Sequence, residues 1–385
     1  MNDAKIILIL GGGVGGVVTA VTLRKRLPAK HRILLVDRQK DHLFAPSLLW
    51  LMTGKRSPQQ IVRSLMRLGR KGIEVIHGTV ESIDPETRRV VVNGTTLEAD
   101  HLVIALGAEL ALDAIPGLAE AGHTFYTLDG ASDLQKAFRG FGSGRLAVLT
   151  AAPAYKCPAA PYEAAMLLES ELRKRGIREQ VQIDLYAAEP GPMGVAGPEV
   201  SAAVRGMVEG KGIAYHPEHQ VVSVDPGAKE LHFANGTSAT FDLLAYVPPH
   251  RAPEAIRKAG LANEAGWIPV DQNTLQTRFA GVHAIGDVTT IPLKMGKPLP
   301  KAGVFAHGQA EVVAGNIAHS ILGTGKPQSF LGHGECFVEV GDGKAALGTG
   351  NFYGEPTPKI HMKAPSWYWH LGKVLFEKTW FWRWF

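Results

Sequence analysis

The amino-terminal glycine cluster constrains the fold of this chain more than any other feature. The apolar run Ile6–Leu10 leads directly into Gly11-Gly12-Gly13-Val14-Gly15-Gly16, and a helical pattern follows from Val17 to Leu27. A second apolar run, Arg32–Asp37, ends in an acid about 20 residues after the glycines. A strand, a glycine turn, a helix and a strand that ends in an acid are the parts of a dinucleotide-binding βαβ unit.

Each residue type in this turn has a physical task. Gly11 permits the tight turn, Gly13 lets the backbone approach a pyrophosphate, and Gly16 allows the helix to pack closely. The pyrophosphate would lie at the helix N-terminus, and Asp37 would accept hydrogen bonds from the adenosine ribose. An empty glycine-rich α/β unit is the alternative, but the order of the elements favours a nucleotide site.

A second α/β unit is predicted near the middle of the chain, with an unusual turn. The strand-like run Leu146–Thr150 precedes a helical pattern from Ala164 to Leu172. An enzyme that binds two dinucleotides would carry the glycine turn for NAD(P)H between these two elements. Here the segment Ala152–Glu163 contains Cys157 and three prolines instead. This exchange indicates that electrons enter through sulfur and not through nicotinamide.

The composition excludes several classes of protein. A chain of 385 residues exceeds one hydrophobic core and predicts two or three domains. The net charge of +5 is scattered along the chain, which gives no support to nucleic-acid binding but suits an anionic membrane. The two cysteines, Cys157 and Cys336, are too few for a disulfide framework or a multi-cysteine metal site, and no metal is predicted. Two lone cysteines are usually inert core residues, but the neighbours of Cys157 favour a redox role.

Two further segments resemble known FAD motifs. His101–Ala108 is a strand that ends in a small-residue turn, and Phe279–Asp287 is a strand closed by Gly-Asp. They resemble the connecting and C-terminal FAD motifs of the two-dinucleotide-binding disulfide oxidoreductase superfamily. The resemblance implies that the first nucleotide is FAD, with Asp287 at its ribityl chain. The FAD-binding residues that it implies are Gly11, Gly12, Gly13, Val14, Gly15, Gly16, Asp37, Ser47, Val80, Ala105, Gly107, Gly286, Asp287 and Lys301.

Within that superfamily the chain resembles sulfide:quinone oxidoreductases and the flavoprotein subunit of flavocytochrome c sulfide dehydrogenase. The segments that carry this resemblance are Phe44–Leu48, Lys156–Glu163, Pro300–Gly303 and Gly334–Phe337. It implies that Cys157 and Cys336 form a redox disulfide beside the flavin, which sulfide attacks by thiol–disulfide exchange.

Three charged residues have roles under the same resemblance. Glu163 would exchange a proton as sulfide enters, although an acid at this point also suits a helix N-terminus. Lys156 is a candidate for the positive charge that favours a thiolate. Lys301 would stabilise the reduced flavin, and a surface lysine is the alternative.

The chain also departs from these families. A third catalytic cysteine is absent before the Cys157 segment, so long polysulfur chains between cysteines are not expected. The loop of residues 42–48 has no cysteine, so the FAD should be bound non-covalently. The loop of residues 190–195 lacks the histidine that some quinone reductases carry there.

The resemblance implies an α/β fold with two Rossmann-like domains and a C-terminal membrane-interface region. The FAD domain should be discontinuous, over residues 1–110 and 240–325. The second Rossmann-like domain, with Cys157, should cover residues 111–239, and the C-terminal region with Cys336 residues 326–385.

The C-terminal segment of residues 367–385 is the second informative feature. It holds five of the seven tryptophans, alternating with Lys373, Lys378 and Arg383. This is the composition of an amphipathic helix at a membrane interface, and a helix docked on the core or in a dimer is the alternative. The resemblance points to Phe337, Lys373 and Phe376 as a quinone site, although both phenylalanines also suit a core.

These features predict a peripheral membrane protein, without stating the side of the membrane. The segment Met1–Lys5 does not resemble a signal peptide, and no run of 18 apolar residues predicts a membrane-spanning helix. A homo-oligomer stays open.

The predicted function is FAD-dependent oxidation of sulfide to sulfane sulfur, with membrane quinone as the electron acceptor. A type II NADH:quinone dehydrogenase is the first alternative, but it requires a glycine turn after Leu146–Thr150. The flavoprotein subunit of a sulfide dehydrogenase that donates to cytochrome c is the second. A non-catalytic redox sensor with the two cysteines as its switch is the third.

Overall fold

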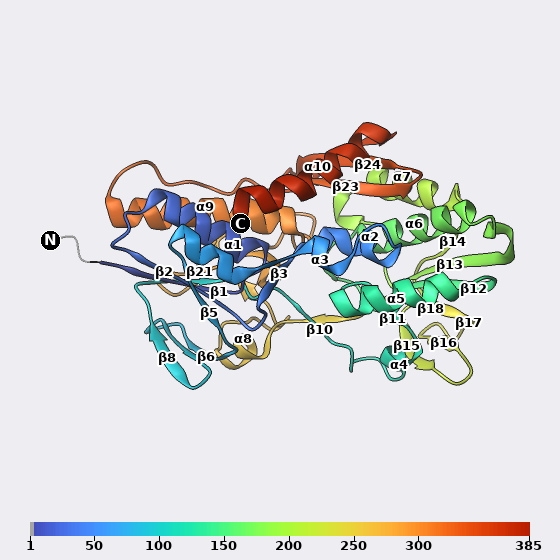
Figure 1. Ribbon diagram of the computed structural model, residues 1–385, viewed down its shortest axis with the longest axis horizontal. Coiled ribbons are helices and arrows are strands. Elements are labelled where there is room, and N and C mark those ends of the chain that lie inside the picture. The colour runs from blue at the N-terminus through green and yellow to red at the C-terminus, as the bar shows by residue number, and fades with distance from the viewer. Residues whose placement is uncertain (1–3) are drawn as a thin grey trace.

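Two parallel sheets of five strands each form the body of the molecule. The computed structural model describes residues 4–385, so Met1, Asn2 and Asp3 of the segment judged not to be a leader lie outside the described residues. The two sheets lie side by side along the longest axis (Figure 1). Their strands are nearly continuous apolar runs, as expected of parallel sheets that helices or other layers cover on both faces.

The first sheet contains the predicted dinucleotide unit. Its strands are, in spatial order, β21 (Val282–Ala284), β9 (His101–Ile104), β1 (Ile6–Leu10), β2 (Arg32–Asp37) and β5 (Glu74–His77). All neighbours are parallel, and β1 lies between β9 and β2. Helices α1 (Val14–Arg26) and α9 (Gly303–Leu322) pack together over one face of this sheet (Figure 1).

The second sheet contains the strand that precedes Cys157. Its strands are β11 (His123–Thr124), β18 (Leu243–Val247), β12 (Gly144–Thr150), β13 (Val181–Ala187) and β14 (Ala214–His216), all parallel. The helices around it are α5 (Leu128–Gly140), α6 (Ala160–Lys174) and α7 (Pro198–Glu209).

Smaller elements surround the two sheets. Three antiparallel sheets consist of β6–β8 (Val80–Asp84, Arg89–Val92, Thr95–Glu98), β15–β17 (Val221–Asp225, Glu230–Phe233, Ser238–Thr240) and β23–β25 (His333–Gly341, Lys344–Asn351, Lys359–Ser366). The two-strand pairs are β3 with β4 (Asp41–Leu43, Val62–Ser64), β10 with β19 (Glu109–Leu110, His250–Arg251) and β20 with β22 (Ile268–Pro269, Thr289–Thr290). The short helices are α2 (Leu48–Met52), α3 (Pro58–Ile61), α4 (Leu118–Ala121), α8 (Glu254–Lys258), η1 (Ala45–Ser47), η2 (Leu65–Lys71), η3 (Arg178–Gln180), η4 (Gly194–Ala196) and η5 (Gly286–Val288).

The chain passes between the two sheets at the antiparallel pair β10–β19. Strand β18 lies in the second sheet, between β11 and β12, although the sequence assigned residues from 240 onward to the first domain. A strand belongs to the sheet with which its backbone forms hydrogen bonds, and the composition of the strand does not indicate which sheet that is. We therefore propose to divide the domains at β10 and β19.

The C-terminal region packs against both halves of the molecule. Strand β23 lies along α6 of the second unit, and α10 (Trp367–Trp384) contacts α1, β23 and β24. Figure 1 shows α10 on the same side of the molecule as α9 and α1. Across residues 4–385, no helix combines the length and apolarity that crossing a membrane requires.

Candidate functional site

The glycine turn adopts a geometry that only glycine tolerates at two positions. Gly11 has φ +105°, and a Cβ there would lie 2.3 Å from the Ala105 carbonyl oxygen. A Cβ on Gly16 would lie 1.7 Å from the Gly11 carbonyl oxygen. The first close contact brings β1 against the end of β9, and the second seats α1 on the turn, as the sequence predicted for these residues.

The rest of the turn leaves room for a ligand. A Cβ on Gly13 would meet no protein atom within 4 Å, and the same holds for Gly107 after β9. The carboxylate of Asp37, at the end of β2, accepts a hydrogen bond from the Gly12 backbone amide at 2.5 Å. Val14 is the first residue of α1, whose N-terminus therefore faces this opening.

Asp287 supplies a direct test of whether a cofactor fits here. It lies in η5, just after β21, and its Oδ1 is buried without a hydrogen-bond partner. Burial raises the pKa of Asp287, while the charges of Lys156 and Lys301 oppose that shift. A buried acceptor without a partner is costly unless a ligand hydroxyl completes it. The arrangement fits a hydroxyl of the ribityl chain of FAD, and that contact stays a prediction for Asp287.

Lys301 joins the two halves of the site. Its Nζ donates to the carbonyl oxygens of Asp287 at 2.6 Å and Thr289 at 3.1 Å, and lies 3.4 Å from the ring centroid of Trp267. Its own carbonyl oxygen accepts from the Cys157 amide at 2.7 Å. Burial lowers the pKa of Lys301 to about 8, against the attraction of Asp287. The surface lysine that we gave as the alternative is therefore excluded.

Two of the predicted cofactor residues have other neighbours in the structure. Ser47 is buried, and its hydroxyl donates to Glu377 of α10 at 2.7 Å. Val80 begins β6 and pairs with Val92. Their proposed contacts with FAD stay predictions.

Cys157 is held in a strained backbone conformation. Its φ is +53°, in the left-handed region that non-glycine residues rarely adopt. Its amide donates a hydrogen bond to the Lys301 carbonyl oxygen. Its own carbonyl oxygen accepts two hydrogen bonds, from the Ala160 amide at 2.9 Å and from the Tyr126 hydroxyl at 3.3 Å. These contacts hold the thiol at the N-terminus of α6, where a dinucleotide-binding unit would place its phosphate turn.

Cys336 reaches the same region from β23. Both cysteines are free thiols and pack against the same hydrophobic core, so the predicted disulfide is not formed. Burial raises the pKa of Cys157, and the charges of Cys336 and Glu163 raise it further. Burial, with Glu163, also raises the pKa of Cys336 to about 12. As free thiols, the two cysteines therefore share one electrostatic environment.

A buried ion pair lies beside the two thiols. Glu163, in the first turn of α6, accepts from the Nζ of Lys373 at 2.8 Å and from the Glu339 amide at 2.8 Å. Burial disfavours the Lys373 ammonium, but the charges of Glu163 and Glu339 outweigh this effect and raise its pKa. The Lys373 charge lowers the pKa of both thiols.

Lys373 thus has the electrostatic role for which Lys156 was the candidate. Lys156 is partly buried, and burial lowers its pKa against the attraction of Asp287 and Cys157. Nothing in the sequence brings Lys373 next to Glu163, since the two residues are 210 positions apart. The acid was predicted from its position after Cys157, but its partner was not.

The second dinucleotide-type unit has an acid that sequence reasoning missed. Glu189 follows β13, at the position corresponding to Asp37 in the first unit. Its carboxylate accepts from the hydroxyls of Thr150 at 2.8 Å, Tyr155 at 2.5 Å and Tyr162 at 2.8 Å. An acid that would bind a ribose is therefore occupied by hydroxyls of its own chain. The signal in the sequence was an acid just after the strand 181–187.

The predicted quinone residues lie around the start of α10. Phe337 of β23 packs against Gly372, where an added Cβ would lie 3.2 Å from its ring. Phe376 is 41% exposed and meets Phe44 edge-on, with ring centroids 5.5 Å apart. Lys373 lies three positions before Phe376 on α10, and unlike Phe376 it is buried.

One face of α10 is docked and the other is exposed. The docked residues include Glu377, which pairs with Arg56 at 2.9 Å, and Trp380, whose Nε1 donates to His42 at 3.0 Å. The exposed apolar side chains of α10 are Trp367, Tyr368, Leu371, Leu375, Phe376 and Trp382. The two alternatives given for the C-terminal segment therefore describe opposite faces of one helix.

Comparison with known proteins identifies the family. Residues 5–310 match the family model described as pyridine nucleotide-disulphide oxidoreductase. The chain belongs to this family. It binds FAD and is an FAD-dependent oxidoreductase, in agreement with the predicted fold and cofactor.

Individual relatives narrow the resemblance. The chain is 29% identical to the sulfide-quinone reductase of Aquifex aeolicus, over 99% of this chain and 91% of that protein. It is 26% identical to the mitochondrial sulfide:quinone oxidoreductase of Dictyostelium discoideum, over 90% and 78%. The crystal structure of the sulfide:quinone oxidoreductase of Aquifex aeolicus superposes with a TM-score of 0.89 at 27% identity, over 99% of this chain and 91% of that one.

Proposed function

We propose that this protein oxidises sulfide through Cys157 and Cys336 and passes the electrons by way of FAD to a membrane quinone. The observation that carries this proposal is the second dinucleotide-type unit. Its turn presents Cys157, and its ribose-type acid Glu189 is occupied by three hydroxyls of the chain. The similarity to sulfide:quinone oxidoreductases over nearly the whole chain supports the same assignment.

The oxidative step begins from a disulfide between the two cysteines. The sulfur of HS⁻ bonds to one cysteine as the S–S bond breaks, and the other cysteine leaves as a thiolate. Glu163 accepts the proton of the bound sulfide, and Lys373 stabilises the thiolate charge. A second sulfide then removes the sulfane sulfur, and re-forming the disulfide releases two electrons. Bound FAD supplies the two-electron acceptor for this chemistry.

The cofactor pocket of this chain is formed along the edge of the first sheet where its parallel strands end. Asp37 and the N-terminus of α1 would hold the adenosine and pyrophosphate part. Asp287 would accept from the ribityl chain. Lys301 would contribute positive charge near the ring system and fixes the Cys157 loop through its carbonyl oxygen.

The exposed face of α10 supports a membrane location. Its apolar side chains lie beside cations, among them Lys378 and Arg383, which are 61% and 54% exposed. Aromatic rings at headgroup depth with cations on lipid phosphates are typical of an interfacial helix. A quinone could then enter from the bilayer near Phe337, Lys373 and Phe376, on the surface where the electrons leave.

An anaerobic titration tests the oxidative half of the proposal. Stoichiometric sulfide should bleach the flavin absorbance of the purified protein or produce a long-wavelength charge-transfer band, and NADH should not. Rapid bleaching by NADH without a response to sulfide would contradict the proposal and favour the NADH:quinone dehydrogenase.

Vesicle binding tests the membrane contact. Trp382→Ser removes a side chain that is 85% exposed, and it should weaken cosedimentation with vesicles that contain anionic lipid. Leu112→Ser is the control, because Leu112 is also exposed but lies outside α10. Equal binding of both variants and the unmodified protein would reject α10 as the membrane contact.

A further inference from the structure

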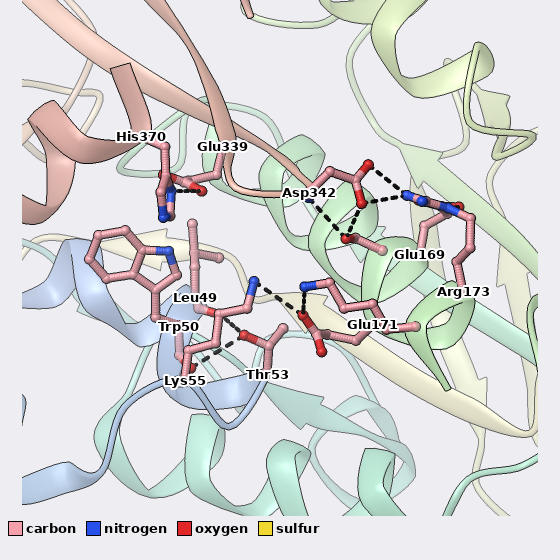
Figure 2. Close-up of polar contacts among 12 residues, drawn as sticks. Leu49, Trp50, Thr53, Lys55, Glu169, Glu171, Arg173, Glu339, Asp342 and His370 are labelled. Atoms are coloured by element: carbon pink, nitrogen blue, oxygen red, sulfur yellow. Dashed lines mark hydrogen bonds and ion pairs between the residues drawn. The ribbon is translucent and has the colours of Figure 1, made fainter. Parts of the chain in front are cut away.

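A second buried carboxylate lies beside the Glu163–Lys373 pair and connects it to the surface. Glu339 of β23 is 1% exposed, and both of its carboxylate oxygens lie 3.0 Å from the Nδ1 of His370. The His370 side chain is 27% exposed. Figure 2 shows His370 reaching from α10 to Glu339 above the indole of Trp50.

The backbone of Glu339 is in turn linked to Lys373 through Glu163, and the Glu339 charge helps to raise the pKa of Lys373. One oxygen of Glu163 accepts from both the Glu339 amide and the Lys373 Nζ, each at 2.8 Å. His370 and Lys373 lie three positions apart on α10, on neighbouring parts of one helix face. A partly exposed imidazole, a buried carboxylate and a buried ammonium therefore follow one another from the surface toward the thiols.

The buried group contains more carboxylates than cations. Two buried carboxylates, Glu163 and Glu339, face one buried cation, Lys373. The two carboxylates therefore carry one more negative charge than Lys373 balances, and a buried net charge is costly. The charged groups near these residues include Arg56, which lies over the Trp50 ring at 4.5 Å and pairs with the buried Glu377 at 2.9 Å. Lys363 lies over the Trp369 ring at 4.9 Å, and the Glu335 charge acts on Cys336.

We propose that His370 and Glu339 carry protons from solvent to the Lys373–Glu163 pair while quinone is reduced. This rests on the proposed function. Oxidising HS⁻ to sulfane sulfur releases two electrons and one proton, and reducing a quinone to quinol takes up two of each. One proton must therefore enter from solvent in each turnover. His370 passes it to the Glu339 carboxylate. Glu339 returns it to Lys373 through one bridging water, after Lys373 has given its proton to an oxygen of the reduced quinone.

The test separates the two halves of the reaction. The flavin of the full-length holoprotein is reduced anaerobically with dithionite, and its reoxidation by decylubiquinone is followed by rapid mixing from about pH 6 to about pH 9. His370→Ala and Glu339→Gln should slow reoxidation on the order of 100-fold at the alkaline end. Flavin reduction by sulfide, measured separately in His370→Ala, should stay within about twofold of the unmodified protein, since the relay serves the other half-reaction. His361→Gln replaces an exposed histidine of β25 and should change neither rate.

Chemical rescue distinguishes a relay from a structural role. Added imidazole should restore reoxidation of His370→Ala, because it fills the space of the side chain and carries a proton. Reoxidation at the unmodified rate in both variants, or slow reoxidation that imidazole does not restore, would overturn the proposal. Reduction by dithionite keeps this test independent of sulfide, so failure of the sulfide titration would contradict the proposed function and leave the relay to be judged by reoxidation.

Discussion

The two βαβ units of this protein share one topology but use the turn after the first strand in opposite ways. In the first unit, β1 leads through glycines to α1, and Asp37 ends β2 beside an open space. In the second, β12 leads through a turn that holds Cys157 to α6, and Glu189 after β13 is covered by hydroxyls. The N-terminus of the helix after the first strand can therefore attract a pyrophosphate in the first unit and favour a thiolate in the second.

The difference shows that the scaffold does not set the ligand. Both turns contain residues with positive φ. Gly11 adopts that conformation freely because glycine has no side chain. At Cys157 the conformation is held by three hydrogen bonds to the amide and carbonyl groups of the residue. In the first unit the backbone is left free for a ligand. In the second unit the backbone is satisfied internally and the side chain is presented.

The largest expected effect follows from removing sulfur from the second turn. Cys157→Ser and Cys336→Ser should each abolish bleaching of the flavin by sulfide, because a hydroxyl cannot form the disulfide that sulfide attacks. Anaerobic titration measures the loss, and the FAD content of both variants should equal that of the unmodified protein. Full bleaching in either variant would show that sulfide does not react through these cysteines. The second unit would then no longer differ from the first by its sulfur chemistry.

The next effect concerns the glycines of the first turn. Gly16→Ala places a Cβ 1.7 Å from the Gly11 carbonyl oxygen, so the turn cannot form and the protein should carry almost no FAD. Gly13→Ala meets no protein atom within 4 Å, so it should fold but bind FAD about tenfold more weakly by crowding the pyrophosphate. Absorbance and fluorescence titration of FAD measure both outcomes.

Gly140→Ala is the matched control for these two variants, because its Cβ would also meet nothing within 4 Å but lies at the end of α5. It should bind FAD normally. Similar FAD binding by Gly13→Ala and Gly140→Ala would argue against a pyrophosphate at this turn.

A moderate effect is expected from removing the tyrosine hydroxyls that bind Glu189 in the second unit. Tyr155→Phe and Tyr162→Phe each remove one hydrogen bond to the Glu189 carboxylate, which should lower the free energy of unfolding by about 1.5–3 kcal/mol. Urea unfolding measures the change, with Tyr246→Phe as the control, because Tyr246 is buried in the neighbouring strand β18. Unchanged stability in both variants would mean that the hydroxyls do not hold the acid, and the contrast with Asp37 would weaken.

The smallest effect concerns the pH dependence of the thiols. Because burial and Glu163 raise the pKa of Cys336 to about 12, alkylation of the reduced protein by iodoacetamide should keep rising through about pH 10 without a plateau. Lys373→Met removes the cation that lowers both thiol pKa values and should slow alkylation several-fold at a given pH. Glu163→Gln should accelerate it, and the opposite order would contradict the assigned charges.

The local parts of this protein could be predicted from its sequence. The glycine turn, its neighbouring strands and Asp37 lie within one short stretch, so spacing alone indicates their geometry. Cys157 and Glu163 were found for the same reason, since they lie at the two sides of one helix start. Ser47 shows the limit of such reasoning, because its hydroxyl bonds to Glu377 of a helix at the other end of the chain.

What the sequence by itself determined was therefore the fold class, the first nucleotide turn and the presence of sulfur in the second. Only the tertiary structure decided which charges surround that sulfur. Lys373 was predicted only as a quinone residue, and Glu339 and His370 were not predicted at all. All three gain their environment when α10 and β23 pack against the rest of the molecule. The physical reason is that burial and pairing of charges depend on which elements meet, whereas the path of a turn depends on the backbone freedom of its own residues.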